Sequence, residues 1–515
     1  MVAIIDDIPT AILRTILCSC LPSKAILPPD SHDLRITLTH VCARWRYIIL
    51  STPAFWTSIV FNPTPRFKNA SHLLNLAKLW LSRSQYCPLT LEFSEELIFT
   101  LRNGKSPKYR DHFLYGGGAY FHTFHSMISP HITHIRHLTC SLITRTTITA
   151  FLRLPSGTFP NLESLGIRFV NEITLCPSLK AFTLDEMAKF TVFLSLPLLK
   201  FLKLEICRGS GLRPLPLKFP WGQLRLLDMG RTPISPKTFI SLLTRTSMNL
   251  VHGSFQVTFP SRRSNGLLSF VNGAHVTMHR MERLRLTLLN PSAEPGLFKL
   301  IRLPSLRSLW VEQTDSKGWR INLYASLLKH TTNLECLALS NPPTSTGSML
   351  DVGAKARNRK SSRRSFHPDL ALEALFKVIK RVHTVYLSTG IYMQTPLLEK
   401  VASGQLLPYL QCLTLSSTSA RNVLEFVRKR YEYAAYSMHI PTTSQQHGVT
   451  IPRPLVSVCL THIQIGTGNE NGDPRPIFSQ LCRQCVGTRI IIKILNVNVN
   501  AANGPVLTLF DSNAI

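Results

Sequence analysis

This sequence has no long apolar run: none of its apolar stretches approaches the roughly 18 residues that a membrane-spanning helix needs. The segment from Met1 to Asp7 contains two acidic residues and no basic one, unlike the basic start of a secretory signal peptide. We therefore expect an intracellular protein, cytoplasmic or nuclear or both, with no membrane partner.

Acidic residues are also scarce, with 28 Asp and Glu in 515 residues against 58 Lys and Arg. No pair of carboxyl groups stands out for acid–base catalysis, and neither a GxSxG nor an HExxH motif occurs. The segment from Arg102 to Ser106 ends like a phosphate-binding loop, but Phe99 stands where that loop needs its first glycine. We expect a protein that is not an enzyme and has no catalytic residue.

Metal and disulfide patterns are weak. The 12 cysteines are scattered and several lie in apolar runs, which favours reduced, buried thiols over a disulfide framework. Five histidines between His122 and His137 are the most metal-like group, yet no nearby acidic residue would orient their rings. Cys482 and Cys485 form a CxxC pair without a second pair. We expect no metal and no other cofactor.

The formal net charge of +30 would suit nucleic acid, an acidic membrane surface or acidic protein partners. The basic residues are spread along the chain, except for six between Lys355 and Arg364. This run follows a segment rich in Pro, Ser and Thr, which predicts an exposed, disordered insertion at 342–366. Either a nuclear localisation signal or a merely solvated loop fits this run.

Two amphipathic helices are predicted in the first 62 residues. The first begins near Asp6 and Pro9, which suit the first turn of a helix, and continues with apolar residues at helical spacing to Leu17. The second spans about Asp33 to Leu50, where apolar residues step by four, three, four and three. So small a unit has little room for a core, so its apolar surface should face a partner or pack on the following domain.

Several segments of this region carry a family resemblance. Ile8 to Leu17 resembles the opening of an F-box, and Val41 to Arg46 resembles its valine-cysteine-x-arginine-tryptophan helix. Leu50 to Trp56, and Leu79 to Leu91 further on, are similar to the F-box-like domain proteins of mushroom-forming (basidiomycete) fungi. The resemblance covers residues 1–95.

This resemblance implies that the helices dock on a Skp-family adaptor, through which the chain would join a cullin–RING ubiquitin ligase. The implied adaptor contacts are Ile8, Pro9, Ile12, Ile16, Val41, Trp45 and Trp56. Burying one such side chain contributes about 1.5–3 kcal/mol, so a handful could give micromolar or tighter binding.

Beyond residue 130 a short pattern recurs, in which an apolar residue is followed three and five positions later by two others. Its copies are Ile135-Leu138-Cys140, Leu162-Leu165-Ile167, Leu199-Leu202-Leu204, Leu224-Leu227-Met229, Met281-Leu284-Leu286, Leu306-Leu309-Val311, Leu334-Leu337-Leu339, Val382-Val385-Leu387, Leu410-Leu413-Leu415 and, as a plausible last copy, Leu455-Val458-Leu460. Several starts lie 25 to 28 residues apart, and Leu250 stands near the start of a missing copy.

This period matches a leucine-rich repeat, in which each copy gives a short strand and a helical or irregular return. The predicted fold class is α/β, with an N-terminal helical F-box-like module followed by an irregular leucine-rich repeat solenoid (horseshoe). The predicted domains are the module at 1–62, a linking helix and strand with an irregular capping segment at 63–130, the solenoid at 131–500 and a C-terminal tail at 501–515.

Side chains that alternate with the buried ones should be displayed on the strand surface of the solenoid. The predicted substrate surface comprises Phe201, Lys203, Arg283, Arg285, Trp310 and Tyr386. Aromatic residues and arginines commonly anchor interfaces. The cations Lys203, Arg283 and Arg285 would favour an acidic or phosphorylated partner segment, and ordinary solvated surface is the alternative.

The sequence thus favours a substrate-recruiting adaptor subunit of an SCF-type cullin–RING ubiquitin ligase, which presents an unknown protein substrate. The alternative is a basic leucine-rich scaffold that binds protein or nucleic acid without a ligase. A third possibility is a family copy that folds but no longer recruits the adaptor. Salt dependence separates the first two, because nucleic-acid binding falls steeply with added salt and an apolar interface does not.

Overall fold

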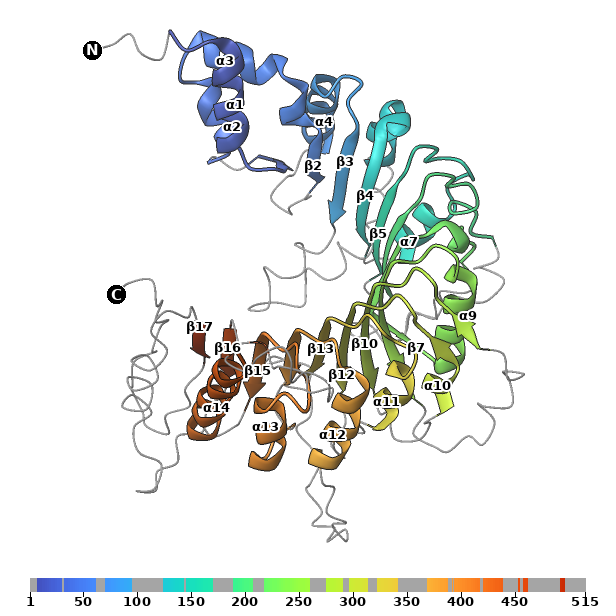
Figure 1. Cartoon of the computed structure of the whole chain (residues 1–515). Coiled ribbons are helices and arrows are strands. Elements are labelled where there is room, and N and C mark those ends of the chain that lie inside the picture. The colour runs from blue at the N-terminus through green and yellow to red at the C-terminus, as the bar shows by residue number, and fades with distance from the viewer. Residues whose placement is uncertain are drawn as a thin grey trace, which may run out of the picture. The chain divides into compact units, whose positions relative to one another are not determined.

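The computed structural model of the chain describes residues 7–29, 32–61, 70–94, 124–142, 145–169, 189–206, 217–259, 275–289, 296–313, 322–340, 368–387, 391, 393–416, 420–438, 453, 457–461 and 491–495. The chain divides into two compact units, Met1–Pro233 (unit 1) and Ile234–Ile515 (unit 2). Both units contain parallel strands with intervening helices (Figure 1). The predicted α/β class is therefore confirmed.

Unit 1 starts with the helices α1 (Thr10–Cys20), α2 (Leu34–Thr39) and α3 (Ala43–Ser51). The prediction of one helix from Asp33 to Leu50 is wrong, because the chain breaks between α2 and α3. Cys42 is extended there (φ −156°, ψ 169°), and its Sγ accepts the N–H of Trp45 at 3.5 Å. Apolar spacing alone cannot reveal this N-cap, because the apolar residues before and after the break keep the same helical spacing of three and four residues.

The sheet of unit 1 begins earlier than the sequence predicts. Strands β1 (Ala25–Leu27) and β2 (Ser58–Phe61) lie within the region predicted as helical, and they pair in parallel. Strands of three and four residues are too short for their alternation to stand out in the sequence. The region of residues 1–62 therefore contributes strands as well as helices.

The rest of unit 1 alternates strands with helices and 3₁₀ turns. Its elements are η1 (Pro53–Trp56), α4 (Ala70–Arg83), β3 (Leu89–Ser94), η3 (Ser129–His134), β4 (Ile135–Leu142), α7 (Arg145–Leu152), β5 (Ser164–Phe169), β6 (Phe201–Ile206), η5 (Trp221–Gln223) and β7 (Leu226–Ile234). Strands β1 to β7 lie side by side in chain order, and each pairs in parallel with the next.

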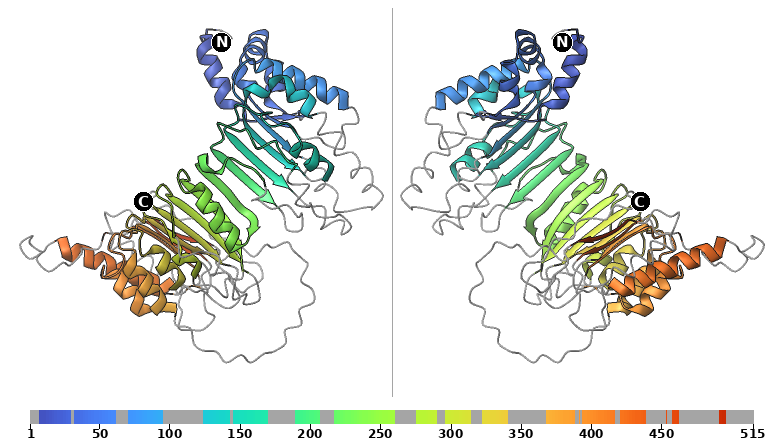
Figure 2. Two further views of the ribbon diagram at one scale, coloured as in Figure 1. Left: turned by 90° about the vertical axis from the view of Figure 1, so that its right-hand side faces the viewer. Right: turned by 90° about the vertical axis from the view of Figure 1, so that its left-hand side faces the viewer.

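Unit 2 repeats the same plan. Its elements are α9 (Pro236–Thr246), β8 (His252–Thr258), β9 (Val276–Thr277), β10 (Arg283–Leu289), α10 (Gly296–Lys299), β11 (Ile301–Arg302), β12 (Ser308–Gln313), α11 (Asn322–Leu328), β13 (Cys336–Ser340), α12 (Pro368–Val378), β14 (Thr384–Leu387), α13 (Thr395–Ala402), β15 (Cys412–Ser416), α14 (Ala420–Met438), β16 (Ser457–Thr461) and β17 (Ile491–Leu495). Its main sheet has the order β8-β10-β12-β13-β14-β15-β16-β17, and β9 pairs with β11 apart from it. Helices α11 to α14 lie along one side of the main sheet (Figure 2).

The sequence repeats form the core of both units. The second and third members of the copies from Ile135 to Leu415 lie on strands, and every apolar residue of these nine copies is at most 2% exposed. Steps of three and two residues keep these side chains on one side of a strand that follows a turn. The last copy lies partly outside the described residues, and its Val458 and Leu460 belong to β16.

The copy expected near Leu250 lies on β8, with Gly253 in place of its second apolar residue. Leu250 and Phe255 are fully buried. A Cβ on Gly253 would lie 2.6 Å from Cε2 of Phe255, so the phenylalanine ring fills the space that a second apolar side chain would take. The repeat pattern misses this strand because glycine does not count as apolar.

The substitution Gly253→Ala should destabilise unit 2 by about 1–3 kcal/mol, because an extra methyl group in a filled core forces the Phe255 ring to move. Thermal unfolding followed by circular dichroism measures the loss. Ser254→Ala is the matched control, since Ser254 points to the opposite face of β8. Equal stability of the two variants would contradict the expectation.

Helix α14 carries a buried arginine. Arg430 is fully buried, and burial lowers its pKa to about 10. Its guanidinium donates to the carbonyl oxygens of Val401 (2.5 Å), Leu407 (3.2 Å), Pro408 (3.1 Å), Leu410 (3.1 Å) and Arg453 (3.0 Å). This single side chain thereby ties α14 to the segment that connects α13 with β15.

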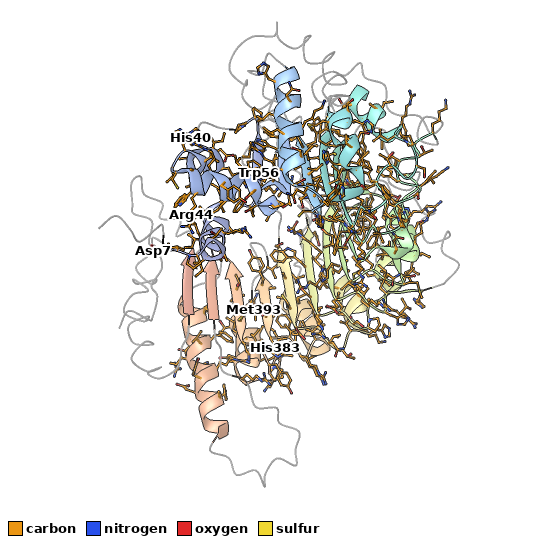
Figure 3. All side chains as sticks on the ribbon, turned by 90° about the horizontal axis from the view of Figure 1, so that it is seen from above. Asp7, His40, Arg44, Trp56, His383 and Met393 are labelled. Atoms are coloured by element: carbon orange, nitrogen blue, oxygen red, sulfur yellow. The ribbon has the colours of Figure 1, made fainter. Side chains whose placement is uncertain are left out.

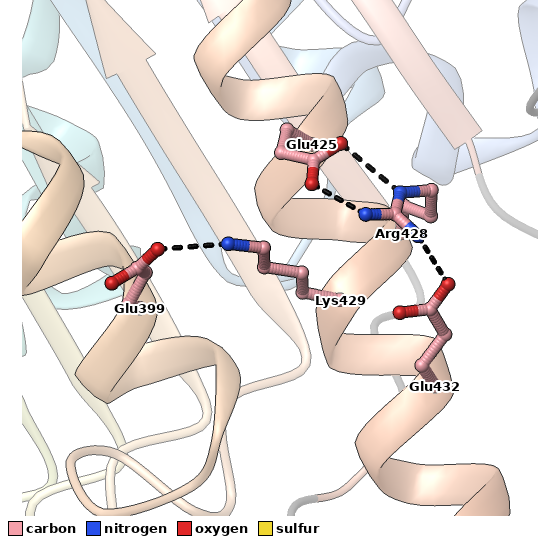
Figure 4. A network of polar contacts seen from close by, with 5 residues as sticks. All are labelled: Glu399, Glu425, Arg428, Lys429 and Glu432. Carbon is pink, nitrogen blue, oxygen red and sulfur yellow. Dashed lines mark hydrogen bonds and ion pairs between the residues drawn. The ribbon is translucent and has the colours of Figure 1, made fainter.

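The outer face of the same helix carries an ion-pair network (Figure 4). Arg428 contacts Glu425 and Glu432, each at 2.5 Å, and Lys429 reaches Glu399 of α13 at 2.8 Å. These side chains are 31–58% exposed, so each pair contributes little to stability compared with the buried contacts of Arg430.

Candidate binding surfaces

The N-terminal helices leave several large apolar side chains uncovered. Ile12, Ile16, Leu34, Ile36, Val41 and Tyr47, called here the N-terminal apolar set, are 36–70% exposed. They lie on α1, on α2, in the turn that follows α2 and on α3. Because contiguous apolar surface commonly marks a partner-binding site, these exposed side chains on neighbouring helices are the candidates for one.

Two arginines hold these helices together. Arg44 donates to the carbonyl oxygen of Ile8 and, at 3.4 Å, to the hydroxyl of Thr10. Arg46 donates to the carbonyl oxygen of Thr39 at 2.8 Å. These bonds join the start of α3 to the start of α1 and to the end of α2, where Figure 3 labels Arg44 and His40. Ile12 lies near the start of α1, and Val41 lies just after the end of α2, so both are at helix ends that these hydrogen bonds connect.

The predicted adaptor contacts differ in how far the structure exposes them. Ile12, Ile16 and Val41 belong to the exposed set, and Pro9 is exposed as well. Ile8 and Trp45 are half-buried. The indole Nε1 of Trp45 is buried, and within the described part of the chain it has no acceptor.

The prediction that Trp56 contacts the adaptor is corrected. Trp56 is a core residue, because its side chain is only 2% exposed. Its Nε1 donates to the carbonyl oxygen of Ile49 at 3.0 Å, and its ring meets Trp80 of α4 edge-on, with centroids 5.2 Å apart. The guanidinium of Arg83 lies 4.8 Å from the ring centroid. Trp56 therefore packs the helical region against α4 (Figure 3).

Arg35 is a further organising residue, which the helical spacing does not single out. It is buried and donates to the carbonyl oxygens of Phe55 (3.1 Å), Lys24 (3.2 Å) and Pro22 (2.5 Å). Burial lowers its pKa, and Asp33 at 3.9 Å partly opposes that effect. Arg35 thereby fixes α2 to the segments that precede β1 and β2.

The second candidate surface is the open face of each sheet, the side whose residues alternate with the buried repeat residues. In unit 1 it carries Phe201 and Lys203 of β6, both exposed. The ammonium group of Lys203 lies 3.1 Å from a carboxylate oxygen of Glu205 on the same strand. The sequence placed both residues on this face without indicating the carboxylate.

The open face of unit 2 carries a row of three side chains, Arg285, Trp310 and Tyr386, which we call the aromatic ladder. Arg285 and Trp310 are paired neighbours on β10 and β12. Ala338 of β13 lies between Trp310 and Tyr386 of β14 at the same level of the sheet. The small Ala338 side chain lets the rings on either side of β13 stack, with centroids 5.6 Å apart. The guanidinium of Arg285 lies 5.4 Å from the Trp310 ring centroid.

The charges on this ladder are largely compensated. Glu312 is buried and accepts from Arg285 at 2.5 Å and from Thr287 Oγ1 at 2.9 Å. Arg283 is exposed, and within the described part of the chain no carboxylate pairs with it. Arg285 is therefore a weaker candidate for binding an acidic segment than its formal charge suggests, whereas the ladder adds two stacked aromatic rings to the open face.

The metal-like histidines form no ion site in the described part of the chain. His131 and His134 belong to η3, and His137 is exposed on β4. Burial and the neighbouring His134 lower the pKa of His131. No group of three or more His, Cys, Asp or Glu among the described residues is placed to hold a metal ion.

Several sequence features fall outside the described residues. They are His122, the Cys482–Cys485 pair, the Arg102–Ser106 segment, the basic insertion at 342–366 and the tail at 501–515. Within the described segments, no helix has both the length and the apolarity to cross a membrane.

No protein-family model matches this chain, and no curated protein matches it significantly.

Proposed function

We propose that this chain is a substrate-recruiting adaptor of an SCF-type cullin–RING ubiquitin ligase. In this proposal the N-terminal region is an F-box-like module that docks a Skp-family adaptor. The following strands form an irregular leucine-rich repeat solenoid, whose open face presents a protein substrate. Ubiquitin transfer itself would be performed by other subunits.

The observation that carries the proposal is the exposure of the N-terminal apolar set. Ile12 and Val41 are more than half exposed, and each belongs to a segment that resembles an F-box. Burying side chains of this size contributes about 1.5–3 kcal/mol each, so several of them can supply micromolar or tighter binding. Hydrogen bonds from Arg44 and Arg46 hold the helices that carry them, which limits the entropy lost on docking.

The repeats support the second half of the proposal. Buried apolar residues recur on successive parallel strands, and the alternate positions carry aromatic and cationic side chains on an open face. A stacked array of this kind offers an extended surface for a protein partner.

The test is co-purification of the full chain with a Skp-family adaptor, followed by affinity measurement for an Ile12→Asp/Val41→Asp variant. The native chain should bind, and the variant should bind at least about tenfold more weakly, because it loses two buried apolar contacts. Both positions are exposed, so circular dichroism should show that the variant remains folded.

The control is Leu79→Asp, which places the same charge at an exposed aliphatic position of α4. It should keep native affinity. A folded native chain that does not bind the adaptor, or a double variant that binds as tightly as the native chain, would overturn the proposal. In that case steeply salt-dependent binding to nucleic acid would favour the scaffold alternative.

A further inference from the structure

The side of helix α12 that faces away from the core of unit 2 is apolar. Leu370 and Val378 are 69% and 37% exposed, and Ala374 between them is exposed as well. Residues four positions apart follow one another along one side of a helix, so these three side chains form a continuous row, called here the α12 stripe. The inner side of the helix is buried separately, at Ala371, Leu372, Leu375 and Phe376. The helix therefore packs on its core without using the stripe.

Helix α9 of the same unit provides a matched comparison. It has the same length as α12, 11 residues, and also begins with proline. Its exposed side chains are Lys237, Thr244 and Arg245, all of them polar. A helix on the surface of a domain normally exposes polar residues opposite its buried side, and α12 departs from that rule. Because contiguous exposed apolar side chains commonly mark a partner-binding site, the α12 stripe is a candidate for one.

Cationic side chains lie at the C-terminal end of the stripe. Lys380 and Arg381 follow α12, and Lys329 follows α11, which packs against α12. We call these three residues the basic end. All three are exposed, and within the described part of the chain none of them forms an ion pair with a carboxylate. The stripe therefore runs into a positively charged region that is accessible to a partner.

The acidic residues of α12 do not compensate the basic end. The two carboxylate oxygens of Glu373 contact Lys377 at 2.9 Å and Lys400 of α13 at 2.8 Å, so this carboxylate already has two cationic partners. Asp369 lies in the first turn of α12, at the opposite end of the helix from Lys380. The positive charge at the end of the stripe thus favours an acidic partner.

Size and charge also argue against other occupants. A second copy of this chain would bring its own basic end to the same place, and the two sets of cations would repel each other. Three side chains are also far fewer than the roughly 20–30 residues that each partner contributes to a stable interface. None of the three is aromatic, unlike the residues that commonly anchor a protein at a membrane surface. A helix with an apolar side and acidic flanks fits both the stripe and the basic end.

We propose that the α12 stripe binds an acidic amphipathic helix of another protein. The partner lays apolar residues, spaced by three or four positions, beside Leu370 and Val378, in the way that ridges of one helix pack into the grooves of another. The small side chain of Ala374 leaves room for an apolar side chain of the partner between them. Carboxylates at one end of the partner helix meet the basic end. This surface lies on the helices of unit 2 and goes beyond the proposed function, since it uses neither the N-terminal apolar set nor the open face.

The test measures binding of labelled synthetic peptides to the full chain by fluorescence anisotropy, without any Skp-family adaptor. The acidic peptide contains four copies of the unit Leu-Glu-Gln-Ala, which gives an apolar row with acidic flanks when it is helical. The basic peptide carries lysine in place of glutamate, and the polar peptide carries serine in place of leucine. The acidic peptide should bind at least about tenfold more tightly than the other two, because only it offers both apolar and acidic contacts.

Two variants separate the charge contacts from the apolar contacts. Lys380→Glu/Arg381→Glu should bind the acidic peptide at least about tenfold more weakly and the basic peptide more tightly than the native chain does. Leu370→Gln/Val378→Gln should bind the acidic peptide no more tightly than the polar one. Arg245→Glu is the matched control, because it reverses an exposed cation near the end of α9, and it should leave binding unchanged. Circular dichroism checks that each variant folds.

Absence of saturable binding of the acidic peptide up to about 1 mM, or native affinity in either folded double variant, would overturn the proposal. A dimer in sedimentation that Leu370→Gln/Val378→Gln dissociates would overturn it in favour of a second copy. Tighter binding to vesicles of anionic phospholipid than to the acidic peptide would overturn it in favour of a membrane surface. None of these measurements involves the Skp-family adaptor, so a negative result rejects this site and not the proposed function.

Discussion

Replacing Arg430 by methionine should lower the free energy of unfolding of unit 2 by about 3–5 kcal/mol. The guanidinium lies in the interior and donates to backbone carbonyl oxygens on both sides of β15 and at the end of α13. Methionine fills a similar volume but has no donor. The carbonyl oxygens would then lose hydrogen bonds in a place that water does not reach.

The local effect can be measured by hydrogen exchange. Amide protection in residues 395–416 should fall in Arg430→Met, while protection in unit 1 should stay as in the native chain. Arg428→Met is the matched control, since it removes a partly exposed arginine from the same helix and should cost less than about 1 kcal/mol. Equal loss of protection in the two variants would contradict this expectation.

Trp56→Ala should destabilise unit 1 by about 3–5 kcal/mol, the loss typical of a buried tryptophan. The substitution removes the edge-on contact with Trp80, the hydrogen bond to the Ile49 carbonyl oxygen and the contact with the Arg83 guanidinium. It also leaves a cavity between the helical region and α4. Urea unfolding followed by far-ultraviolet circular dichroism measures the change.

Tyr47→Ala is the control for this prediction. Tyr47 is 70% exposed, so its removal should change stability by no more than about 0.5 kcal/mol. A Trp56→Ala variant as stable as Tyr47→Ala would show that the ring does not support the fold.

The two tests on unit 1 separate packing from docking. Trp56→Ala should weaken adaptor binding only to the extent that the helices unfold. Ile12→Asp/Val41→Asp should weaken it in a chain that stays folded. This distinction depends on burial, because the sequence resemblance alone treats Ile12, Val41 and Trp56 as equivalent contacts.

Much of the fold could be predicted from the sequence because the repeats leave a local signature. Spacing of three and two residues identifies side chains such as Leu202 and Leu204, which the structure buries completely. The same alternation assigns Phe201 and Lys203 to the opposite face. A strand is missed where that signature is interrupted, as at Gly253, where the ring of Phe255 replaces an absent side chain.

The N-terminal region shows the opposite case. Its apolar residues keep a helical step across Cys42, although the backbone there is extended and α3 begins anew. A periodic pattern reports which residues are apolar, not whether the hydrogen bonds between them are continuous. The burial of Trp56 was likewise invisible, because its partner Trp80 lies on a different helix.

The sequence by itself determined the α/β class, the spacing of the buried residues and the identity of the outward-facing side chains on β6, β10 and β12. These features follow from contacts between residues a few positions apart. Only the tertiary structure decided that Arg168, Lys203 and Arg231 meet at Glu205. That meeting depends on the register between three strands and on a shift by one residue in the burial alternation of β7, between Met229 and Thr232, which brings together charges that lie far apart along the chain.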